Sequence, residues 1–145
     1  GALERVLDET VKYANERTQF GRPIGKFQAI KQQIAILAGE VIAAKTVAET
    51  MVHLTEIDSF KVNMAKLSVN RSAQKSTKIA HQVIGAMGFT NEHVLHFSTR
   101  RLWAWMHESE SEKALALAVG EQALTSKKDV WSLITSNNDK GEKYA

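Results

Sequence analysis

The sequence has 145 residues, of which 43% are hydrophobic and 24% charged, values that fit one globular domain and exclude a disordered or fibrous chain. It contains no cysteine, which excludes disulfides and thiolate metal sites. The net charge of +3 is too balanced for a nucleic-acid-binding face, and no apolar run or leader pattern predicts a membrane span or signal peptide. We therefore expect a cytoplasmic protein with no nucleic-acid and no membrane partner.

The first half of the sequence predicts two helices joined by a short loop. An apolar stripe typical of an amphipathic helix runs from Leu3 to Phe20, and it has no capping sequence ahead of it, so we expect a cut end. A cluster of helix-breaking residues then follows, namely Gly21, Pro23 and Gly25. A second long stripe begins at Phe27 and continues to Met51.

The second half predicts two further helices. Asp58 and Ser59 are good N-cap residues for a third helix that runs to Gly85, and Thr90 or Asn91 can cap a short segment after it. Residues 109–112 have the spacing of a capping box, which predicts a fourth helix from near Ser109. The predicted fold is all-α, an antiparallel up-and-down four-helix bundle over residues 1–136, with a flexible tail at 137–145.

The residues offer little support for metal or hydrolase chemistry. A di-iron bundle needs Glu-x-x-His pairs, which are absent, and the nearest approaches to a ligand cluster are His93 with His96 and His107 with Glu108. We therefore expect no metal site. A Gly-x-Ser-x-Gly nucleophile motif is also absent.

The loop after the first helix is instead suited to binding an anion. Free backbone N–H groups at helix ends and an arginine together bind a pyrophosphate, and Arg17, Gln19 and Gln28 flank this loop. Another interpretation of each residue, taken singly, is structural. Arg17 could pair with Glu16 or another surface carboxylate. Phe20 and Phe27 could be core residues, and Gln82 could be a helix-capping or surface amide.

Three motifs in this order resemble the C-terminal helical domain of acyl-CoA dehydrogenases: Arg-x-Gln-Phe-Gly from Arg17, Pro-x-x-x-Phe-Gln from Pro23, and Gln-x-x-Gly-x-x-Gly from Gln82. The resemblance covers roughly residues 1–125. It implies that FAD, in a site of the partner subunit, is contacted by Arg17, Thr18, Gln19, Phe20, Phe27, Gln28, Gln82, Val83, Ile84, Gly85 and Ala86. Ala86 stands where the family usually has a glycine.

The resemblance also implies the α,β-dehydrogenation of acyl-CoA thioesters by a glutamate base and the flavin. Many members place that glutamate before a glycine and a threonine, both of which are missing here. Counting without a gap puts Ser109 at this position, and a one-residue deletion puts Glu108 there. The alternatives are that Glu108, Glu110 and Glu112 only favour a helix N-terminus, or that the base lies upstream of Gly1.

These implications lead to one functional hypothesis and one alternative. The first is the C-terminal domain of an FAD-dependent oxidoreductase of fatty acid metabolism, with an acyl-CoA substrate, an electron-transfer partner and a homodimeric or homotetrameric assembly. We expect the isolated chain to be inactive and not to retain FAD. The alternative is a non-catalytic assembly subunit or helical oligomerisation module. In either case Trp103 and Trp105 are expected to serve packing or an interface.

Overall fold

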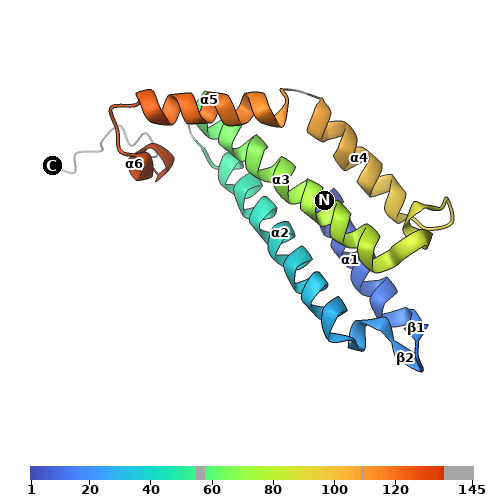
Figure 1. Cartoon of the computed structure of the whole chain (residues 1–145). Coiled ribbons are helices and arrows are strands. Elements are labelled where there is room, and N and C mark those ends of the chain that lie inside the picture. The colour runs from blue at the N-terminus through green and yellow to red at the C-terminus, as the bar shows by residue number, and fades with distance from the viewer. Residues whose placement is uncertain (55–57, 109, 136–145) are drawn as a thin grey trace.

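The computed structural model describes residues 1–54, 58–108 and 110–135, and these residues form a helical structure (Figure 1). A two-stranded antiparallel sheet, β1 (Thr18–Gln19) and β2 (Arg22–Pro23), follows the first helix. Two short 3-10 helices are present, η1 (Ile24–Lys26) and η2 (Gly85–Phe89). The α-helices of the described residues are α1 (Ala2–Glu16), α2 (Gln28–Val52), α3 (Ser59–Ile84), α4 (Leu95–His107), α5 (Glu112–Thr125) and α6 (Val130–Thr135).

Helices α1 to α4 form the up-and-down bundle (Figure 1). Helix α3 packs against α1, α2 and α4, and α1 also contacts α2 and α4. Because consecutive helices run in opposite directions, the end of α1, the start of α2, the end of α3 and the start of α4 share one end of the bundle (Figure 1). We call this the hairpin end. The predicted all-α bundle is confirmed.

The fourth helix of the bundle is α4, not the helix predicted from near Ser109. Its buried positions are Leu95, Ser98, Thr99 and Leu102, a helical spacing of three, one and three residues that is largely polar and so gives a weak apolar signal. The predicted helix corresponds to α5, which runs back along the first half of α3. Arg71 pairs with Glu112 at the start of α5, with 2.9 Å between Nε and Oε1.

The core of the bundle is formed by small and branched apolar side chains from α1 to α4. On α1 the buried residues Val6, Thr10 and Ala14 recur every four residues, and the Thr10 hydroxyl donates to the Val6 carbonyl at 2.6 Å, so its polar group is satisfied inside the helix. The buried cluster comprises Val6, Ala14, Leu37, Val41, Ala73, Ile79, Ala80, Val83, Ile84, Leu95 and Leu102.

The N-caps of α3 and α5 can be compared with the helix starts predicted from the sequence. Asp58 caps α3, since its carboxylate accepts from the Phe60 N–H at 2.9 Å, as predicted. Helix α5 starts three residues later than its predicted start, with Ser111 as the cap accepting from the Ala114 N–H at 3.2 Å. Ser109 and the predicted tail at 137–145 lie outside the described residues.

The first helix is shorter than predicted, because it ends at Glu16 and not at Phe20. The next residues form a hairpin in which Thr18 pairs with Pro23 and Gln19 with Arg22. At its tip Phe20 has φ of 52° and Gly21 has φ of 77°, the positive values that a tight two-residue turn requires. The strands are only two residues long, so they carry no alternating pattern that sequence analysis could detect.

Candidate functional site

Both predicted flavin-contacting segments lie at the hairpin end of the bundle (Figure 1). The Tyr13 ring in the last turn of α1 meets the His93 ring, which precedes α4, edge to face with centroids 5.7 Å apart. The backbone N–H of Arg17 donates to the Tyr13 carbonyl at 2.8 Å. Tyr13 therefore connects the loop after α1, through its carbonyl, to the segment between α3 and α4, through its ring.

The hairpin carries a cluster of aromatic and cationic side chains. Phe20 is 91% exposed and contacts the Phe27 ring edge to face, with centroids 6.1 Å apart. The Arg22 guanidinium carbon lies 4.4 Å from the Phe27 ring centroid, a cation–π contact that holds the positive charge against the ring. The sequence alone assigned no role to Arg22, although it lies inside the motif that carried the resemblance.

The hairpin is fixed to α1 by close backbone contact. A Cβ at Gly25 would lie 3.1 Å from the Ala14 carbonyl oxygen, closer than an ordinary Cβ contact, so glycine favours the close packing of η1 against α1. The Ile24 N–H also donates to the Arg17 carbonyl at 2.8 Å. The position of the hairpin is therefore set by α1.

The predicted polar residues of this loop are exposed. Arg17, Thr18, Gln19 and Gln28 all face solvent. Within the described residues Arg17 forms no ion pair, so the alternative pairing with Glu16 is not present in this structure. The guanidinium is available to a ligand.

The residues predicted at the end of α3 divide into two groups. Gln82 and Ala86 are exposed, and Gly85 has φ of 69°, which turns the chain out of the helix. The Val83 and Ile84 side chains are instead part of the buried core, so their side chains cannot line a cofactor. A contact at these two positions can use only the backbone.

A groove of about 550 Å³ lies beside Gln82, and it includes residues that no sequence motif indicated. The His81 ring stacks on the Phe89 ring with centroids 4.3 Å apart. Burial lowers the pKa of His81 below its usual 6.5, and its Nδ1 has no hydrogen-bond partner in the described part of the chain. The remaining lining residues are Thr77, Lys78 and Trp103.

Glu108, the predicted base, lies away from the hairpin end. It closes α4 as its C-cap residue, about 20 Å along the helix from its start at Leu95. It is exposed, whereas Glu112 lies in the first turn of α5. The alternative role at a helix N-terminus therefore fits Glu112 and not Glu108.

The end of α4 is held by side chains of α3. Lys66 Nζ donates to the Trp105 carbonyl at 2.8 Å, and the Asn70 amide donates to the Met106 carbonyl at 3.5 Å. The last carbonyls of a helix lack partners within the helix, so these bonds satisfy two of them. They also fix the backbone from which Glu108 projects.

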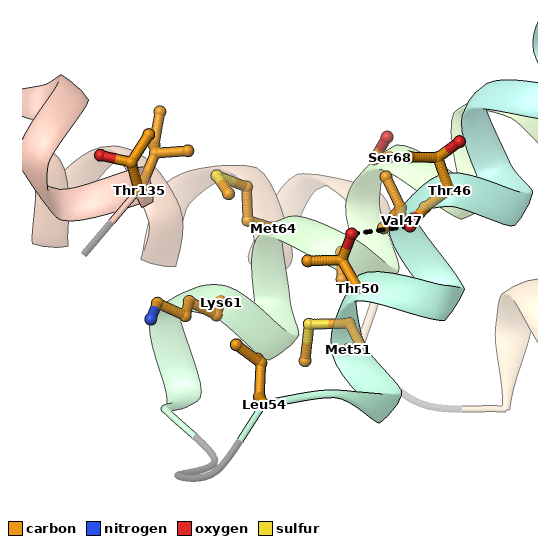
Figure 2. Close-up of a pocket in the computed structure, with 11 residues that line it drawn as sticks. Thr46, Val47, Thr50, Met51, Leu54, Lys61, Met64, Ser68 and Thr135 are labelled. Atoms are coloured by element: carbon orange, nitrogen blue, oxygen red, sulfur yellow. Dashed lines mark hydrogen bonds between the residues drawn. The ribbon is translucent and has the colours of Figure 1, made fainter. Parts of the chain in front are cut away.

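An apolar pocket of about 640 Å³ lies where α2 ends and α3 begins, remote from the hairpin end (Figure 2). Figure 2 shows Met51, Leu54 and Met64 bordering it, with a hydrogen bond from the Thr50 hydroxyl to the Thr46 carbonyl at 2.8 Å on its wall. No sequence motif marked this pocket.

The histidines near the start of α4 serve the local backbone. His93 Nδ1 accepts from the Leu95 N–H at 3.1 Å, and His96 Nδ1 lies 2.7 Å from the His93 carbonyl. The described residues contain no group of three His, Cys, Asp or Glu side chains placed to hold a metal ion. Among the helices of the same residues, none is long and apolar enough to cross a bilayer.

Comparison with known proteins identifies relatives of this chain. Residues 1–109 match the family model described as "Acyl-CoA dehydrogenase, C-terminal domain". The chain is 39% identical to the acyl-CoA dehydrogenase IpdE2 of Mycobacterium tuberculosis (strain ATCC 25618 / H37Rv) over 103 residues, which are 70% of this chain and 31% of that protein. It is 35% identical to the glutaryl-CoA dehydrogenase of Desulfococcus multivorans over 97 residues, 64% of this chain and 25% of that protein.

The fold is also similar to that of solved structures. In the structure of a glutaryl-coenzyme A dehydrogenase in complex with glutaryl-CoA, the match has a TM-score of 0.78 at 28% identity and covers 85% of this chain and 32% of that one. The chain thus spans about a third or less of the length of the relatives it matches.

Proposed function

Because this chain belongs to the acyl-CoA dehydrogenase family, as its C-terminal domain, we propose that its hairpin end binds the diphosphate and adenosine portion of FAD. The flavin ring of this cofactor accepts a hydride when an acyl-CoA thioester is dehydrogenated. The residues proposed to contact FAD are Arg17, Thr18, Gln19, Phe20, Phe27, Gln28, Gln82, Gly85 and Ala86, with Val83 and Ile84 contributing backbone only.

The observation that supports this proposal is the pair of arginines at the hairpin. Arg17 has no ion-pair partner within the described residues, and Arg22 rests on the Phe27 ring. A guanidinium binds phosphate oxygens through two parallel hydrogen bonds, and the exposed Phe20 ring offers a face to a planar group. Gln82, at the same end of the bundle, adds an amide that can donate and accept.

The experiment uses this chain together with the domains that hold the flavin ring in members of the family, because the resemblance implies that those domains are needed to retain FAD. Arg17→Gln should release FAD on gel filtration at a concentration that leaves the unmodified protein yellow. Lys12→Gln on α1 is the matched control, because it removes an exposed positive charge away from the hairpin. Equal loss of FAD in both variants would count against a site at the hairpin.

We propose Glu108 as the base that takes a proton from the carbon next to the thioester carbonyl. Its support is its position at the end of α4, which Lys66 and Asn70 hold in place. Glu108→Gln should abolish bleaching of the flavin by an acyl-CoA under anaerobic conditions, and Glu110→Gln should not. Bleaching that persists in Glu108→Gln would place the base elsewhere.

The alternative function is a non-catalytic assembly subunit, and exposed apolar side chains favour it. Leu124 is 89% and Trp131 74% exposed, and both belong to the arm formed by α5 and α6. Surfaces of this kind often mark contacts between chains. Light scattering that gives a dimer or tetramer, together with a complete protein that neither retains FAD nor bleaches, would favour assembly over catalysis.

A further inference from the structure

A second groove, of about 500 Å³, lies between the start of α1 and the outer face of α4. Arg5 of α1 and Arg101 of α4 both line it, together with the partly exposed rings of Phe97 and Trp105. Neither the flavin-contacting motifs nor the predicted base includes any of these four residues. The groove is separated from Arg17 by about 18 Å along α1.

The charges in this groove are not neutralised within the described residues. Neither Arg5 nor Arg101 forms an ion pair there. The neighbouring Glu4 is engaged by Lys45 at 2.8 Å and by the amine of Gly1, which also lines the groove, at 3.0 Å. Both guanidiniums are charged at any physiological pH, and two like charges lining one groove repel each other unless an anion lies between them. Such a pair favours a carboxylate or phosphate as ligand.

The groove leads towards Glu108. Residues 97, 101, 105 and 108 are spaced by four, four and three positions, so they project from one side of α4 and its last turn. Arg101 and Glu108 are separated by about 10 Å along the helix axis. A short carbon chain and the reach of an arginine side chain together span this separation, and the Trp105 ring lies between the two ends.

We propose that this protein acts on acyl-CoA thioesters whose acyl group carries a second, distal carboxylate, and that Arg5 and Arg101 bind that carboxylate. The inference rests on the proposed function, with Glu108 as the base. The acyl carbon that loses its proton lies at Glu108, the body of the acyl group lies along Trp105, and the distal carboxylate lies between the guanidiniums. Arg5 and Arg101 thus determine specificity and take no part in proton transfer.

The first test measures binding by the 145-residue chain without any flavin. Monomethyl adipate, an ester with one distal carboxylate, should shift the NMR signals of the Trp105 indole N–H and the Arg101 Nε–H in a concentration-dependent manner. Dimethyl adipate has the same body without the charge and should not. Arg101→Gln should weaken binding about tenfold, and Arg100→Gln, which removes the neighbouring exposed charge outside the groove, should not.

Three results of this test would overturn the proposal. Equal binding of the two esters would show that the charge is not recognised, and equal weakening by Arg100→Gln and Arg101→Gln would show only a diffuse charge effect. Adenosine 3′,5′-bisphosphate that moves the same signals where monomethyl adipate does not would assign the groove to a nucleotide phosphate.

The second test separates this inference from the proposed function. In the complete flavoprotein, Arg101→Gln should lower kcat/KM for adipoyl-CoA about tenfold and leave that for hexanoyl-CoA unchanged. If both substrates bleach the flavin and the variant affects neither selectively, the further inference fails alone. If neither acyl-CoA bleaches the unmodified protein, the proposed function fails, and the NMR titration still decides whether the groove binds a carboxylate.

Discussion

Tyr13 and His93 join two distant segments of the sequence through an edge-to-face contact of their rings, with centroids 5.7 Å apart. Such aromatic pairs contribute about 1 kcal/mol beyond the area they bury. We expect Tyr13→Leu to lower the free energy of unfolding by about this amount, because leucine keeps apolar bulk and removes the ring. Urea denaturation followed by circular dichroism measures the change. Tyr13→Phe keeps the ring, so a loss as large as that of Tyr13→Leu would contradict the role of the pair.

Gly25 and Gly39 should respond to alanine in opposite directions. A Cβ at Gly25 would meet the Ala14 carbonyl at 3.1 Å, and backbone cannot move aside easily, so Gly25→Ala should destabilise the fold by about 1–3 kcal/mol. Gly39 lies inside α2, where an added Cβ would meet no atom within 4 Å, so Gly39→Ala should stabilise by about 0.5–1 kcal/mol. Thermal unfolding of both variants checks the pair. A tolerated Gly25→Ala would mean that η1 can move away from α1.

The bundle itself could be predicted from the sequence, because its first three helices carry long apolar stripes and Asp58 provides a clear N-cap. The hairpin could not, since two-residue strands have no period and Phe20 is an unusual residue for a positive φ. The sequence predicts only a short segment where α4 forms, because the buried face of this helix includes Ser98 and Thr99.

The motif residues at the hairpin end could be predicted as cofactor contacts, because the spacing within each motif, such as those that begin at Arg17 and at Gln82, is visible in the sequence itself. The burial of Val83 and the groove at Arg5 and Arg101 depend on how helices pack, which no local pattern specifies. For the same reason the stacking of His81 on Phe89 could not be predicted.

Glu40 makes the stability of the fold depend on pH in the acid range. Its carboxylate accepts from Lys75 at 2.6 Å and from Ser72 at 2.9 Å, and the hydrogen bond from Lys75 is the main cause that lowers its pKa below 4.5. Since the pKa is lower in the folded state than in the unfolded chain, this carboxylate stabilises the fold above the unfolded pKa, and that contribution is lost as the pH falls through the folded pKa.

Glu40→Gln should therefore be less stable than the unmodified protein at pH 7, by about 1 kcal/mol, and the difference should shrink as the pH falls below about 4.5. Urea denaturation across a pH series measures it. Glu121→Gln, an exposed position on α5, should show little difference at any pH. A difference for Glu40→Gln that persists unchanged into strong acid would contradict the electrostatic origin.

Ser76 is fully buried, and its hydroxyl has no hydrogen-bond partner within the described residues. A buried polar group without a partner carries a desolvation penalty, so Ser76→Ala should raise the free energy of unfolding by about 1 kcal/mol. Ser72→Ala is the control that should be destabilising, because it removes the donor to Glu40. A destabilising Ser76→Ala would indicate that a buried water satisfies the hydroxyl.

Phe20 has a left-handed backbone conformation, which is uncommon for a residue with a Cβ, and it keeps its ring in solvent. The backbone conformation opposes folding of the isolated chain. Phe20→Gly should therefore make the domain more stable by itself, because glycine adopts this φ without strain. The loop already holds the Phe20 ring in its exposed position before anything binds. A ligand or protein that contacts this ring therefore binds without a conformational change of the loop.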